Sequence, residues 1–112
     1  MVDLDGLPGE ALVRRGLEDL ARGARSAEAL TVALATGRLR RCGLALPEES
    51  ALPDDRELAL YALLVARGEG DAYARYNALR RELDSFLEAL EARLRRAQDP
   101  AARSSSRPAN TV

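Results

Sequence analysis

The residue types that most often carry out chemistry in proteins are nearly absent from this chain. It contains no histidine and no lysine, and Cys42 is its only cysteine. Histidine is a frequent general base and metal ligand, while lysine binds phosphates in P-loops and forms Schiff bases. The composition therefore excludes Ser-His-Asp and Cys-His catalysis, lysine-based phosphate binding, Schiff-base chemistry and the usual histidine and thiolate zinc sites.

Regularly spaced carboxylates are the remaining residues that could do chemistry. Asp84, Glu88 and Glu91 stand at i, i+4 and i+7, so a helix places them on one face, as in some all-helical enzymes that hold magnesium. Arginines lie on the same face and are spaced for i,i+4 ion pairs, Arg80 with Asp84 and Glu91 with Arg95. We therefore expect a solvated, ion-paired face with no metal and no cofactor. A small carboxylate- and Mg²⁺-dependent helical enzyme is kept as an alternative.

The densest basic cluster is Arg38, Arg40 and Arg41, which could contact a phosphate backbone or another anion. Cations are also favoured at a helix C-terminus, where this cluster is expected to lie. The whole chain has 17 basic and 18 acidic residues and a net charge of -1, so it lacks an overall positive field. Nucleic acid is therefore not the expected partner. A small regulator that binds nucleic acid through this local cluster is the other alternative.

Cys42 has no histidine to activate it, so we expect it to be a small packed hydrophobe. A single cysteine fits a reducing cytoplasm. The first five residues lack the basic and apolar regions of a signal peptide, and the chain has no run of 18 apolar residues. These features predict a cytoplasmic protein without a membrane segment.

Apolar residues with helical spacing predict two helices in the first half of the chain. Leu, Ala and Val dominate, and neither Ile nor Trp occurs, which favours helix over sheet. The first helix is predicted over 8–22. Ser26 is a good N-cap for the second, over 27–42, which has a possible break at Gly37 and a stop at Gly43.

The second half begins after a connection, 43–53, that contains two prolines. A third helix is predicted over 55–67, where Asp54 and Glu57 have the spacing of a capping box. Nine consecutive apolar or aromatic residues, 58–66, predict that this helix is the one most enclosed by others.

The last predicted helix, 72–98, is the longest and follows Asp71, a good N-cap. Its apolar residues fall within one arc about 100° wide. The arc contains Tyr76, Leu79, Leu83, Phe86, Leu87, Leu90 and Leu94. The polar, serine- and proline-rich segment 99–112 cannot bury enough surface to fold alone and is predicted to be a flexible tail.

Together these elements predict an all-α, four-helix bundle-like domain over 1–98. It consists of two antiparallel hairpins, 8–42 and 54–98, joined by the connection 43–53. At 1.5 Å per residue the last helix extends about 40 Å, whereas the others reach only about 20 to 24 Å. Part of its apolar face is therefore expected to lack a covering within the chain.

A second copy of the chain is the simplest covering for such a face. We expect a non-enzymatic protein-interaction or scaffold module that self-associates as a homodimer, or that contacts another protein, through its last helix. The expected contact residues are Tyr76, Leu83, Phe86, Leu87, Leu90 and Leu94.

Overall fold

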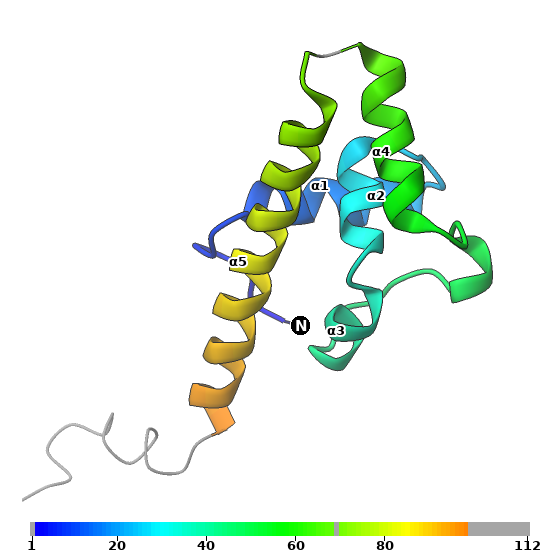
Figure 1. The fold of residues 1–112 in the computed structure, drawn as a ribbon. Helices are drawn as coiled ribbons and strands as arrows, with labels where there is room; N and C mark the ends of the chain where they lie inside the picture. The colour runs from blue at the N-terminus through cyan, green and yellow to red at the C-terminus, as the bar shows by residue number, and fades with distance from the viewer. Residues whose placement is uncertain (1, 69, 99–112) are drawn as a thin grey trace, which may run out of the picture.

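All regular structure in the described residues, 2–68 and 70–98 of a computed structural model, is helical. The all-α fold class is therefore confirmed. The predicted tail, 99–112, lies outside the described residues. The elements in chain order are α1 (Glu10–Ala21), α2 (Ala27–Ala33), α3 (Thr36–Arg41), the short 3-10 turn η1 (Glu49–Ala51), α4 (Arg56–Arg67) and α5 (Ala72–Gln98) (Figure 1).

Side-chain caps begin three of the helices. The Ala29 backbone N–H donates to Ser26 Oγ over 3.0 Å at the start of α2. At the start of α5, the Ala74 backbone N–H donates to Asp71 Oδ1 over 3.1 Å. At α4 the predicted cap is corrected, because Asp55 rather than Asp54 accepts from the Leu58 N–H, over 3.0 Å. Glu57 does not complete a capping box, since its carboxylate bonds to side chains of α5 instead.

The predicted helix 27–42 is split into α2 and α3. The backbone leaves the helical region at Ala35 (φ −123°, ψ 30°), two residues before the predicted break at Gly37. Arg56 explains the position, because its Nη1 donates to the Ala33 carbonyl oxygen over 3.0 Å and to Thr36 Oγ1 over 2.9 Å. A residue from a later helix thus stabilises the break. The described chain has five α-helices in place of the four predicted.

The most enclosed helix is α2, not α4 as the sequence predicts. Within its seven residues only Glu28 is not buried, and α2 contacts α1, α4 and α5. By contrast, α4 stands at one edge of the molecule beside the first part of α5 (Figure 1). Its long apolar run shows that the helix is apolar on all sides, yet only Leu60 and Leu64 are buried.

Two apolar clusters lie along α5. The first joins Phe86, Leu87 and Leu90 to residues of α1, α2, α3 and the N-terminal segment. The second joins Leu79 to the inner side of α4 and to residues of α1 and α2. The long helix therefore packs against different parts of the chain along its length.

Helices α1 and α2 approach closely at Gly16. A Cβ atom at this position would lie 2.6 Å from the Glu28 carbonyl oxygen and would also overlap the Val32 side chain. Because one of the two obstacles is backbone, the clash cannot be relieved by a rotamer change alone. Gly16 therefore sets the distance between these two helices.

Gly16→Ala is expected to lower the free energy of unfolding by about 1–3 kcal/mol, as is usual for overpacking. Gly37→Ala is the matched control, because a Cβ there meets only Arg41 Nη1, at 3.6 Å. Alanine is the better helix former, so the control should unfold at the same temperature or slightly higher. Thermal denaturation followed by circular dichroism measures both. An equal loss in the two variants would contradict the close approach at Gly16.

Candidate functional site

Four of the six contact residues that the sequence predicts are buried within the single chain. The side chains of Leu83, Phe86, Leu87 and Leu90 are at most 3% exposed. Leu94 is partly buried against the same cluster. The expectation that this part of α5 lacks a covering within the chain is therefore wrong.

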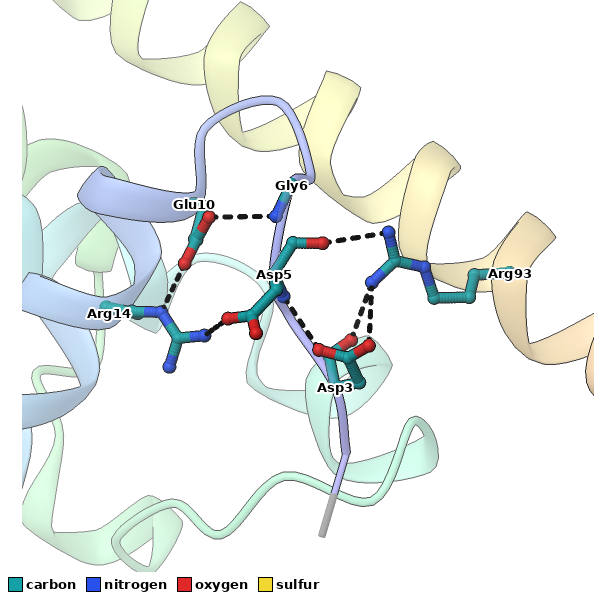
Figure 2. A network of polar contacts seen from close by, with 6 residues as sticks. All are labelled: Asp3, Asp5, Gly6, Glu10, Arg14 and Arg93. Carbon is teal, nitrogen blue, oxygen red and sulfur yellow. Dashed lines mark hydrogen bonds and ion pairs between the residues drawn. The ribbon is translucent and has the colours of Figure 1, made fainter.

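Part of the covering comes from the N-terminal segment that precedes α1. Leu4 and Leu7 are buried in the cluster around Phe86. Arg93 of α5 anchors this segment, because its guanidinium donates to the carbonyl oxygens of Asp3 and Asp5 over 3.0 and 2.9 Å (Figure 2). This role is not predicted from the sequence, because the segment precedes the first predicted helix and its first five residues are considered only as a possible signal peptide.

A second set of contacts ties the same segment to α1. The Asp5 carboxylate accepts from Arg14 over 2.7 Å, and Arg14 also donates to Glu10 over 2.6 Å (Figure 2). Glu10 in turn accepts from the Gly6 backbone N–H. The hydrogen bond from Arg14 is the main reason that the pKa of Glu10 is lowered. The segment is thus held between α1 and α5.

The predicted basic cluster is divided between different partners. Arg38 binds Glu91 of α5 through two hydrogen bonds, of 3.1 and 2.7 Å, which lower the pKa of that carboxyl. Arg40 pairs with Glu49 of η1 and also donates to the Pro47 carbonyl oxygen. Two of the three guanidiniums therefore already bind within the chain. Arg41 is exposed and lines a surface hollow beside Arg38.

The predicted carboxylate face has different ion pairs from those expected. Glu91 pairs with Arg38 rather than Arg95, and Arg80 pairs with Glu57 of α4 rather than Asp84. In the described part of the chain, no group of three or more Cys, Asp or Glu residues is placed to hold a metal ion. The same residues include no helix that is both long and apolar enough to cross a bilayer.

The exposed large apolar side chains gather on α4 and the start of α5. Among the described residues they are Leu58 (62% exposed), Tyr61 (37%), Val65 (54%) and Tyr73 (65%). We call this set the outer α4 face. Leu58, Tyr61 and Val65 follow i, i+3, i+7 spacing and therefore share one side of the helix. The sequence indicates this exposed apolar side, because a run of nine apolar residues must place apolar side chains on more than one side of its helix.

Tyr76 is the one predicted contact residue that lies beside the outer α4 face. Its ring meets that of Tyr61 edge to face, with centroids 6.1 Å apart and planes at 80°. Its hydroxyl donates to Glu57 over 3.2 Å and accepts from Arg80 over 3.1 Å. These contacts join α4 to α5. They also form one wall of an open hollow of about 480 Å³, lined by Asp55, Glu57, Leu58, Tyr61, Tyr73 and Tyr76.

No protein-family model, curated protein or solved structure matches this chain. The residues and their geometry therefore carry the functional argument.

A separate ion-pair network fixes the turn that leads into α4. Glu49 accepts from Arg40, Arg56 and Thr36. These hydrogen bonds lower the pKa of Glu49 from 4.5 to about 2, and the bond from Arg40 has the largest effect. The carboxylate is thus held in its charged form by the two guanidiniums on either side.

The lowered pKa of Glu49 predicts a pH dependence of stability. Because the pKa is lower in the folded chain, the contribution is complete well above pH 4.5 and is lost as the pH falls towards 2. Glu49→Gln should lower the melting temperature at pH 6, and the difference from wild type should shrink as the pH falls to 2. Glu48→Gln, at an exposed neighbouring position outside the network, is the control. A constant difference for Glu49→Gln across this range would contradict the assignment.

Proposed function

We propose that this chain is a non-enzymatic protein-interaction module that self-associates through its outer α4 face. The observation that supports this proposal is that α4 is apolar all round, whereas only one of its sides is buried. A helix that is apolar on every side normally has partners on every side. The outer side is only partly covered within the described residues, because Tyr61 meets Tyr76 while Leu58 and Val65 stay more than half exposed, so a second protein surface is its natural covering.

A second copy of the chain fits this face because its two aliphatic side chains, Leu58 and Val65, are placed symmetrically about the middle of the helix. In α4, Arg56–Arg67, the midpoint falls between Tyr61 and Ala62. Leu58 and Val65 lie at equal distances from it, about 5 Å along the axis at 1.5 Å per residue. A two-fold axis through this midpoint would pair antiparallel helices and place Leu58 of one copy against Val65 of the other.

The charges at the ends of α4 favour the same antiparallel pairing. Asp54, Asp55 and Glu57 lie at its start, where the one arginine, Arg56, pairs with Glu49, and Arg67 is its last residue. Antiparallel pairing places the acidic start of one helix near the basic end of the other. Parallel pairing would instead place the acidic ends together, at an electrostatic cost.

The size of the face predicts a weak dimer. Stable interfaces bury about 800 Å² and involve about 20–30 residues on each side. The outer α4 face has four large side chains, so we expect association at high micromolar concentration and dissociation on dilution. This face therefore supports a transient dimer that covers part of the exposed apolar surface, and not a permanent assembly.

Light scattering over a concentration series tests the proposal. The wild-type mass should rise from 12.1 kDa towards twice that value as the concentration increases. Val65→Glu would place a carboxylate in the apolar contact and should weaken association at least about tenfold, or 1.4 kcal/mol. Because Val65 is 54% exposed, the single chain should keep its helicity and melting temperature.

Two further variants serve as controls for this measurement. Ser85→Glu adds the same charge at an exposed position farther along α5 and should leave the dimer unchanged. Leu90→Glu would place the charge in the core and should lower the melting temperature. A wild-type mass of 12.1 kDa at every concentration would contradict self-association. Equal weakening by Val65→Glu and Ser85→Glu would contradict the assigned face.

A further inference from the structure

The hollow beside the outer α4 face has the chemistry of a cation site. The charged residues in its lining, Asp55 and Glu57, are both acidic, and Glu57 Oε2 already accepts from Arg80 and from the Tyr76 hydroxyl. The other lining residues are Leu58 and three tyrosines, which are all the tyrosines in the sequence. Aromatic rings attract cations to their faces, and nearby carboxylates add to that attraction.

The arrangement of the tyrosines makes two walls rather than a flat surface. The planes of Tyr61 and Tyr76 are nearly perpendicular, at 80°, with ring centroids 6.1 Å apart. Tyr73 comes from the first turn of α5 and is 65% exposed, so its ring is accessible from solvent. Rings at right angles give a cation more than one aromatic contact within a small volume.

The chain itself shows that a guanidinium fits against this aromatic cluster. The guanidinium carbon of Arg80 lies 5.8 Å from the centroid of the Tyr76 ring. Arg80 is not among the residues that line the hollow. On the side of the hollow, Asp55 uses Oδ1 to accept from the Leu58 N–H, so its other oxygen is available to a ligand.

We propose that this hollow binds an organic cation, and that in the dimer the cation is the guanidinium of an arginine from the second copy. This inference rests on the proposed function, because it names what the second copy inserts. The source follows from composition, since the chain has no lysine and all 17 of its basic residues are arginine. A planar guanidinium can also stack on an aromatic ring while it donates to a carboxylate.

Tyrosine fluorescence provides a direct reporter for this site. The sequence has no tryptophan, and every tyrosine lines the hollow. Dilute wild-type chain is titrated with L-arginine amide, and with citrulline amide as the neutral probe of similar shape. Arginine amide should give a saturable change in emission that weakens with added salt. Citrulline amide should give none. No saturable change with arginine amide, or an equal change with both probes, would overturn the inference.

Two variants test the residues of the site. Asp55→Asn removes one charge while keeping a side chain that can cap α4, and Tyr73→Leu removes an exposed ring while keeping an apolar side chain. Each should weaken binding of arginine amide about two- to fivefold, the scale of exposed ion pairs and cation–π contacts. Ser85→Glu, outside the hollow, should leave it unchanged. Unchanged affinity in both site variants would overturn the assignment of the hollow.

Competition separates this inference from the proposed function. Saturating arginine amide should return the wild-type dimer to 12.1 kDa in light scattering, because it occupies the hollow that the second copy fills. Selective binding of arginine amide to a chain that never dimerises would contradict self-association and leave the cation site standing. A dimer that forms without any response to arginine amide would contradict the cation site and leave self-association standing.

Discussion

The structure depends on how the apolar face of α5 is covered. This helix is 27 residues long, and short segments supply the covering of its second half. Burial of a large aliphatic or aromatic side chain contributes about 1.5–3 kcal/mol, so exposing this face would cost several such contributions. The cluster that buries it also contains Leu4, Leu7, Leu39 and Leu52, from the N-terminal segment, α3 and the turn before α4.

Helix α4, in contrast to α5, is packed against the rest of the chain on only part of its apolar surface. The first half of α5 and α2 pack against the side of α4 that carries Leu60 and Leu64, and α5 also contacts α4 at Tyr61 and Glu57. Within the described residues, the opposite side of α4 carries the exposed Leu58, Tyr61 and Val65. The exposed apolar surface therefore lies on α4 and not on the second half of α5. The proposed self-association and the proposed cation site both depend on this exposed surface of α4.

Features fixed by neighbouring residues could be predicted from the sequence, and features fixed by distant residues could not. The bounds of α5 and the Ser26 cap depend on local spacing, and both predictions are confirmed. The break between α2 and α3 is stabilised by Arg56, more than 20 residues away from Ala33, and it lies two residues before the glycine at which the sequence predicts it. Leu4 and Leu7 precede the first predicted helix, so helical periodicity did not predict that they are buried in the core.

The candidate surface could be predicted only in part for the same reason. An apolar run shows that α4 has two apolar sides, but periodicity does not say which side another helix will cover. Tyr76 is a predicted contact residue and lies beside the outer α4 face, whereas Tyr61 and Tyr73 are not among the predicted contact residues. Their contribution to one hollow requires the α4–α5 contact.

A symmetric disulfide tests the account most directly. Ala62 is exposed and lies beside the proposed two-fold axis, where two cysteines could approach to the distance that a disulfide needs. In a chain with Cys42→Ala, mild oxidation of the Ala62→Cys variant should give a covalent dimer, while Ser85→Cys should stay single. A single chain for Ala62→Cys together with a covalent dimer for Leu94→Cys would contradict the account and return the contact to α5.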